Sequence, residues 1–147
     1  TDCLNVGDEI AEELEHLGIR GTTDPGDWFG EPGPEEWEAF LANATAVGLD
    51  RPPEVERAES MAEVVWRRHG RAANQVVSLI REDPSMGELA LAESDLLRAE
   101  LHVMAEREMI VRPDDLLRRR TKLALITRGD DLGADPGMAE INATFGF

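Results

Sequence analysis

Hydrophobic residues recur three and four positions apart along most of this chain, which is the spacing of an amphipathic α-helix. Prolines, glycines and the Asp83-Pro84 pair separate one such stretch from the next. The pattern predicts helices at about 34–47, 54–69, 71–82, 95–109, 113–127 and 138–145. No stretch alternates as a strand does, so the predicted fold class is all-α, a compact bundle of about five to six short helices without a substantial sheet.

The first part of the chain has a different organisation. Residues 1–18 place Ile10, Leu14 and Leu17 at helical spacing among acids, and Gly18 is a typical stop. Residues 19–33 are rich in glycine and proline, which predicts a linker, with Trp28 and Phe29 as hydrophobic anchors for it. The sequence therefore predicts a helix at 1–18, a linker at 19–33 and a helical domain at 34–147.

Two helix starts are predicted from local residue types. Ser94 is a candidate N-cap for the helix that runs from Asp95 to Met109. Pro113 suits a first helical position, followed by acids that the helix dipole favours, and Gly129 to Gly137 reads as a turn.

The stretch 113–127 combines an apolar stripe with an arginine run. The stripe consists of Leu116, Leu117, Leu123, Ala124 and Ile126. Residues Arg118–Arg120 spread around more than half a turn, so we expect at least one arginine near the buried side.

Two carboxylates lie close to this run in sequence. Glu108 and Asp115 are therefore candidates for structural ion pairs with Arg119 and Arg120, and Asp115 and Arg119 have the i, i+4 spacing of one helix face. The alternative is that the acids orient an arginine towards an anionic ligand, because guanidinium groups bind phosphate or carboxylate in bidentate fashion. We favour the structural interpretation.

Composition narrows the classes of function. The net charge of −16 argues against nucleic acid or an anionic membrane surface as a partner. A single cysteine excludes an internal disulfide, and the chain shows neither a transmembrane run nor a signal peptide, so we expect a cytoplasmic protein. There is no nucleotide-binding glycine motif, and the three histidines have no ligand spacing, so we predict no catalytic residue and no metal site.

Four motifs between about residues 67 and 126 carry a family resemblance: RRHG, LIREDP, LRAELHVMAEREM and DDLLRRRTKLAL. In this order they resemble the C-terminal helical domain of FAD-dependent glycerol-3-phosphate dehydrogenases. The family positions are occupied here by Glu108, Met109, Asp115, Leu117, Arg119, Arg120, Thr121 and Leu123. His69 stands where the family often has tyrosine, and Arg112-Pro113 where many members have Thr-Leu.

The resemblance implies a division of labour. The parent oxidises sn-glycerol 3-phosphate to dihydroxyacetone phosphate, passing a hydride to FAD and then electrons to a quinone or oxygen. Its flavin fold and catalytic residues belong to preceding domains, so this chain is expected to hold no cofactor and to be catalytically silent. It would be a cap on the FAD and substrate domains of the same protein, an oxidoreductase of glycerol metabolism. The resemblance also implies that the parent is peripheral to the inner face of the membrane, and homodimer contacts are a further expectation.

The start of the chain, TDCLNVGDEI, also looks like the residues that follow a G-G-K-L/Y-T motif in this family. On this resemblance, residues 1–18 are the last helix of the FAD-binding domain, and Thr1 approaches the cofactor in the parent only.

Two other classes of function remain open from the sequence. One is a free-standing helical interaction or regulatory module whose acidic surface meets a basic partner. The other is a small-anion sensor that uses Arg118–Arg120.

Overall fold

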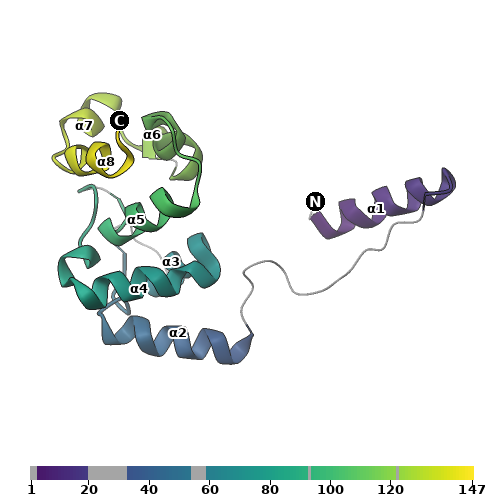
Figure 1. Cartoon of the computed structure of the whole chain (residues 1–147), viewed down its shortest axis with the longest axis horizontal. Coiled ribbons are helices and arrows are strands. Elements are labelled where there is room, and N and C mark those ends of the chain that lie inside the picture. Colours follow the sequence, from purple (N-terminus) through teal and green to yellow (C-terminus); the bar gives the residue numbers. More distant parts are fainter. Residues whose placement is uncertain (1–2, 20–32, 54–58, 93, 122) are drawn as a thin grey trace. The chain divides into compact units, whose positions relative to one another are not determined.

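The computed structural model describes residues 3–19, 33–53, 59–92, 94–121 and 123–147, and side-chain environments from Val6 onward. The chain divides into two compact units, Thr1–Glu31 and Pro32–Phe147 (Figure 1). The elements, in chain order, are α1 (Cys3–His16), α2 (Pro34–Ala46), α3 (Met61–His69), η1 (Gly70–Ala72), α4 (Ala73–Glu82), η2 (Pro84–Gly87), α5 (Arg98–Arg107), η3 (Asp115–Arg120), α6 (Leu123–Ile126), α7 (Gly129–Ala134) and α8 (Gly137–Phe145). The all-α prediction is confirmed: within the described ranges, β pairing is limited to an isolated antiparallel bridge between Leu89 and Leu97.

The first unit contains α1, as the spacing of its apolar residues predicts. Gly18 ends it with a φ of 75°, a backbone conformation that glycine adopts without strain. Ile10 and Leu17, on the apolar face of α1, are exposed among the described residues of this unit. No helix in the described part of the chain is long and apolar enough to cross a membrane.

In the second unit, α2 begins as predicted. Pro34 lies in its first turn, and the amide of Gly33 donates to the carboxylate of Glu36 (3.2 Å), which closes the helix N-terminus. Phe40 is buried and packs against Trp66 of α3, with ring centroids 4.5 Å apart. This aromatic contact joins α2 to α3.

Helix α3 begins at Met61, which corrects the predicted start near residue 54; residues 54–58 lie outside the described part. Ser60 and Glu63 form a capping box, because the Ser60 amide donates to Glu63 (2.6 Å) and the Glu63 amide donates to Ser60 Oγ (3.3 Å). In addition, the amide of Ala62 donates to the carbonyl of Leu49 (2.8 Å). These bonds fix the start of α3.

Helix α5 begins at Arg98, so the prediction of a helix from Asp95 capped by Ser94 is wrong. Ser94 instead closes a turn: its hydroxyl donates to the carbonyl of Leu91 (2.9 Å) and accepts from the amide of Leu96 (3.2 Å). The helix starts later because Leu97 pairs with Leu89 in extended conformation and is itself the N-cap.

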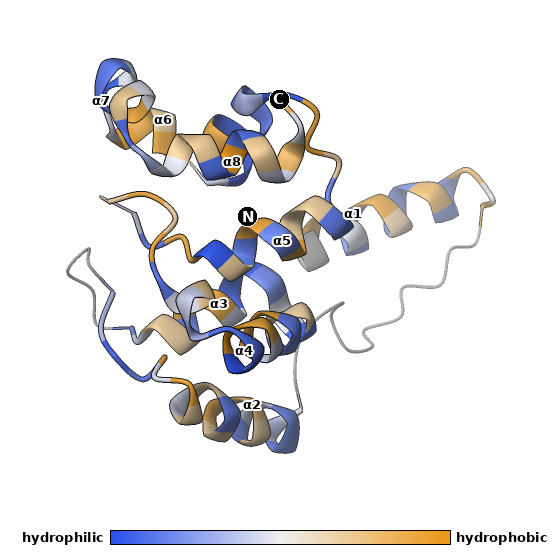
Figure 2. Ribbon diagram, turned by 60° about the vertical axis from the view of Figure 1, so that its left-hand side comes forward, coloured by the Kyte–Doolittle hydropathy of each residue, from blue (hydrophilic) through white to orange (hydrophobic). Residues whose placement is uncertain are grey.

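Two hydrophobic cores share α5. We call the first core the cluster built mainly by α2, α3 and α4, and the second core the cluster built mainly by η3, α6, α7 and α8. Helix α5 contributes Ala99 and Val103 to the first core, together with its N-cap Leu97, and Leu101 and Met104 to the second. Apolar segments accordingly lie on both sides of α5 (Figure 2).

The stretch predicted as one helix at 113–127 is broken. Residues 115–120 form a π-helical turn, and Thr121 ends it by donating its amide (3.0 Å) and its hydroxyl (2.8 Å) to the carbonyl of Leu116. Of the predicted stripe, Leu116, Leu117 and Leu123 are buried and Ala124 is partly buried. Ile126 is 70% exposed, against prediction, because the break at Thr121 interrupts the helical register.

The predicted turn from Gly129 to Gly137 is also corrected, since α7 occupies its first six residues. Two acids lie in the first turn of α7, where the helix dipole favours them, and Leu132 is buried in the second core. Burial of this side chain outweighs the low helix propensity of the flanking glycines. The last helix, α8, lies where the pattern predicts it.

Candidate functional site

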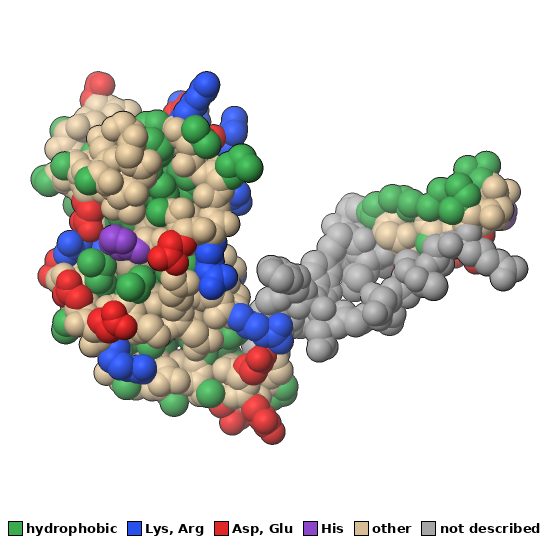
Figure 3. Space-filling model, viewed as in Figure 1, with side chains coloured by type: hydrophobic (Ala, Val, Ile, Leu, Met, Phe, Trp, Pro, Cys, Tyr) green, Lys and Arg blue, Asp and Glu red, His purple; other side chains and the backbone are tan. Residues whose placement is uncertain are grey.

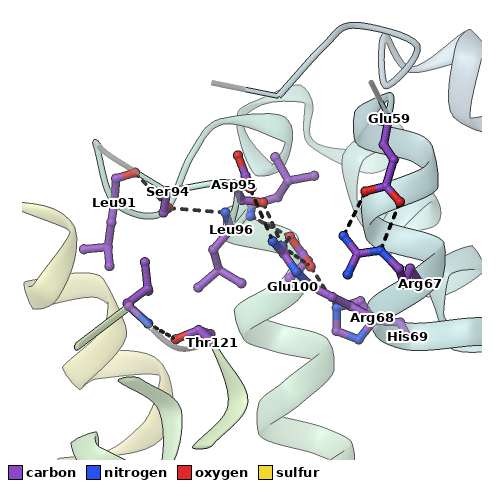
Figure 4. A network of polar contacts seen from close by, with 12 residues as sticks. Glu59, Arg67, Arg68, His69, Leu91, Ser94, Asp95, Leu96, Glu100 and Thr121 are labelled. Carbon is purple, nitrogen blue, oxygen red and sulfur yellow. Dashed lines mark hydrogen bonds and ion pairs between the residues drawn. The ribbon is translucent and has the colours of Figure 1, made fainter. Parts of the chain in front are cut away.

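The most distinctive polar feature is a carboxylate inside the second unit. Glu100 lies in the first turn of α5 and is fully buried, and Ser94 and Asp95 are buried just ahead of it. Buried carboxylates require partners, because an unpaired charge away from water is costly. Figure 4 shows the partners of Glu100 converging from the last turn of α3 and from the segment before α5.

Each oxygen of Glu100 has more than one contact. Arg68 Nη1 lies 3.0 Å from both Oε1 and Oε2, and His69 Nε2 lies 2.9 Å from Oε1. The amide of Leu97 donates to Oε2 (2.8 Å), so Glu100 also caps the helix that carries it. We call Arg68, His69, Asp95 and Glu100 the Glu100 network.

Local sequence places the two basic side chains of the network. Arg68 and His69 form the C-terminal turn of α3, where positive side chains interact favourably with the helix dipole. Gly70 then ends the helix with a φ of 53°. Arg68 also donates to the backbone carbonyl of Asp95 (2.8 Å), and its Nη2 lies 4.0 Å from the Asp95 carboxylate.

The environment keeps Glu100 ionised. Burial by itself raises the pKa of this carboxyl, but the hydrogen bond with His69, the charges of Arg68 and His69 and the amide of Leu97 outweigh it. The pKa of Glu100 therefore lies below its usual value. The network is an anion held by two basic side chains and a backbone amide.

This geometry suits a structural role better than catalysis. Glu100 is fully buried and the side chain of His69 is only 4% exposed, so a substrate has little access to either. Arg68 is 23% exposed. No group of three or more His, Cys, Asp or Glu side chains within the described ranges is arranged to hold a metal ion. What the network does is join α3 to α5.

The residues predicted as ion-pair candidates lie elsewhere, at the surface. Asp115 Oδ1 and Arg119 Nη1 are 2.8 Å apart on the π-helical turn, and Glu108 Oε2 lies 2.8 Å from Arg120 Nε. The second pair joins the end of α5 to the end of η3. The Arg119 side chain is 78% exposed and that of Arg120 is 48% exposed.

The expectation that one arginine of the run lies near the buried side is wrong, since Arg118 is exposed as well. The element is only about one π-turn long, and Leu116 and Leu117 fill its buried side. Each guanidinium faces a carboxylate, with Asp114 lying 3.4 Å from Arg118. We therefore do not propose an anion site at Arg118–Arg120.

Asp115 has a second task. Its Oδ2 accepts from the amides of Val111 (3.2 Å) and Arg112 (3.0 Å), which closes the turn ahead of Pro113. The Val111 amide is the main cause that holds the pKa of Asp115 below its usual value, and burial opposes it only in part. The carboxylate at this position thus shapes the entry into η3.

Because the guanidinium group of each pair is exposed to solvent, we expect Arg119→Ala and Arg120→Ala each to lower the free energy of unfolding by less than about 1 kcal/mol. Urea melts of the two variants beside the wild type measure this. A loss of several kcal/mol in either variant would show that the pair is shielded from solvent, contrary to the structure.

The Glu100 network was not predicted from the sequence, although a signal was present. Glu100 falls between Leu97, Leu101 and Met104 at the i, i+3, i+4, i+7 spacing of a buried face. A carboxylate on such a face indicates a buried partner. Thr1, the tentative cofactor contact, and the anchors Trp28 and Phe29 lie outside the described residues.

An open pocket of about 400 Å³ lies beside the second core. Leucines line its apolar side, and Thr127, Asp131 and Asp135 contribute polar groups. Asp135 is engaged by the backbone, accepting from the amides of Ala92 (3.0 Å) and Gly137 (2.8 Å). Its carboxylate therefore fastens the start of α8 to the segment before α5.

The fold and the buried network together define an all-α domain in which a buried carboxylate joins two of the helices. Comparison with known families agrees with this class. The family model for the C-terminal domain of alpha-glycerophosphate oxidase matches residues 32–144, so the chain belongs to that family, and the resemblance inferred from the motifs is confirmed. Searches of curated proteins and of solved structures gave no significant match.

Proposed function

We propose that this chain is the accessory C-terminal domain of a flavin-dependent enzyme that oxidises sn-glycerol 3-phosphate to dihydroxyacetone phosphate. The observation that carries the proposal is the family match over residues 32–144. The internal use of Glu100, Arg68 and His69 supports a structural role, because these groups serve the packing of helices and are withdrawn from solvent.

FAD does not fit the described part of this chain. Flavin dinucleotides bind at the end of a strand, where a glycine-rich turn leads into a helix. The described residues form helices, and their isolated bridge between Leu89 and Leu97 is not such a strand. The proposal therefore assigns FAD, substrate binding and the electron acceptor, quinone or oxygen, to the preceding domains of the parent.

Within that parent we propose residues 1–18 as the last helix of the FAD-binding domain, with Thr1 near the cofactor, and 19–33 as the linker. Residues 34–147 are then the cap. The exposed Ile10 and Leu17 of α1 supply an apolar face for such packing. The whole enzyme would lie in the cytoplasm at the inner face of the membrane, with homodimer contacts as a further option.

The cap needs a fixed shape to pack on a catalytic body, and its surface is compatible with this use. Acidic and basic side chains are interspersed with hydrophobic ones on the face of the second unit shown in Figure 3. The ion pair between Arg98 and Glu140 (2.8 Å) joins α5 to α8. We infer that the cap contributes shape and contacts, while the chemistry belongs to the rest of the enzyme.

The purified chain tests this proposal. After incubation with FAD and gel filtration, we expect it to show no flavin absorbance and no dye reduction with glycerol 3-phosphate. A flavin-dependent glycerol-3-phosphate dehydrogenase of known activity serves as the positive control in the same assay. Turnover by the isolated chain would overturn the proposal.

A further inference from the structure

Glu100 occupies the place where the two cores meet. On the same helix, Ala99 and Val103 belong to the first core, while Leu101 and Met104 belong to the second. Both cores are apolar, and the contact between α3 and α5 at this point is polar. The Glu100 network is therefore the part of the domain interior that depends on charge.

The charged and titratable side chains that face Glu100 come from two places. The last turn of α3 supplies Arg68 and His69, and the segment before α5 supplies Asp95, which faces Arg68. Arg98, the first residue of α5, forms ion pairs with Glu140 of α8 and with Glu88 instead. Arg67 is turned away and pairs with Glu59 (3.0 Å).

A neutral carboxyl group cannot replace the carboxylate here. Two of its contacts, the Arg68 guanidinium and the Leu97 amide, can only donate, so a protonated carboxyl oxygen that faced them would lose its hydrogen bond. Neutralisation therefore leaves a guanidinium without its anion and weakens the N-terminal cap of α5.

We propose that the Glu100 network is an acid-sensitive joint: when the Glu100 carboxylate is neutralised, residues 97–101 at the start of α5 loosen from the last turn of α3 while the rest of both cores stays folded. The second core is made of apolar side chains, and most of them come from η3, α6, α7 and α8 rather than from the start of α5. The opening is local because the apolar contacts of α5 further along the helix do not depend on charge.

The direction of the pH dependence follows from the pKa of Glu100, which lies below its usual value. The joint is closed at neutral pH. It opens only as the pH falls below the ordinary glutamic acid value of about 4.3 and approaches the lower value in the folded chain.

Amide hydrogen exchange of the whole chain tests the proposal, with rates corrected for the intrinsic effect of pH. In Glu100→Gln at pH 7, we expect the amides of residues 97–101 to exchange roughly 100-fold faster than in the wild type. On acidification, the corrected exchange rates of residues 97–101 in the wild type should rise to those of Glu100→Gln. The rates of these residues in the variant should not rise further. Amides of α4 should keep their protection in both.

Glu63→Gln is the matched control, because Glu63 caps the other end of α3 at the surface. It should leave residues 97–101 protected. The proposal is overturned if Glu100→Gln keeps wild-type protection at 97–101, or if Glu63→Gln opens them equally. If Glu100→Gln does not fold, the acid titration of the wild type decides: loss at 97–101 before α4 supports the joint, and simultaneous loss contradicts it.

Discussion

Replacing Glu100 with alanine is expected to lower the free energy of unfolding by about 3–5 kcal/mol at pH 7. The change removes the anion that holds Arg68 and His69, and it leaves the Leu97 amide without its acceptor. Urea melts followed by far-UV circular dichroism give the value. The large effect is expected because the site is fully buried, so water cannot replace the lost partner.

Arg67→Ala is the matched control. Arg67 is the neighbour of Arg68 on α3, and its replacement breaks an ion pair with Glu59. Both partners of that pair are largely exposed, so we expect a loss below about 1 kcal/mol. Equal losses in the two variants would contradict the structural account of Glu100.

The difference in unfolding free energy between the wild type and Glu100→Ala is expected to depend on pH. Because the pKa of Glu100 is lowered on folding, its contribution to stability is complete above the ordinary value and declines as the pH falls towards the folded value. The difference between wild type and Glu100→Ala should therefore shrink below about pH 4.3. A difference that grows on acidification would show that the carboxyl is neutral in the folded chain.

Gly137→Ala is expected to cost about 2–3 kcal/mol. A Cβ at this position would lie 1.8 Å from the backbone carbonyl oxygen of Ala90, a contact that cannot be relieved by a change of rotamer. The start of α8 would have to move, and with it the amide of Gly137 that donates to Asp135 (2.8 Å). Thermal and urea unfolding of the variant measure the loss.

Gly133→Ala gives the comparison, because a Cβ there meets nothing within 4 Å. Gly133 lies inside α7, where alanine is the better helix former, so we expect a gain of about 0.5–1 kcal/mol. If both variants lose stability to the same extent, the close approach of Gly137 to Ala90 is not what sets the cost.

The all-α class and most helices could be predicted because an apolar face repeats with the helical period. Helix starts were predicted less well. The start of α3 has a local signal, the Ser60-x-x-Glu63 capping box, at which the helix begins rather than near residue 54. The start of α5 depends instead on the bridge between Leu89 and Leu97 and on Glu100, whose burial is set by partners on α3 more than 30 residues away, and such contacts leave no local pattern.

The motifs that carry the family resemblance have different structural roles, some at the surface and some in the interior. Arg119 and Arg120, which stand out in the sequence as part of an arginine run, have exposed side chains that pair with the partly buried Asp115 and Glu108. The less conspicuous RRHG and LRAE motifs contain Arg68, His69 and Glu100, which join the helices inside the domain. A single carboxylate in a helical pattern is predicted to be a surface residue, because its buried partners come from other helices.

The coding sequence upstream of Thr1 tests the central claim most directly. It also distinguishes the accessory domain from the free-standing interaction module, which is the alternative consistent with the net charge of −16. The account predicts an open reading frame that continues upstream into a flavin-binding domain and ends that domain with a G-G-K-containing motif at Thr1. A start codon directly before Thr1, with no flavin domain in frame, would contradict it.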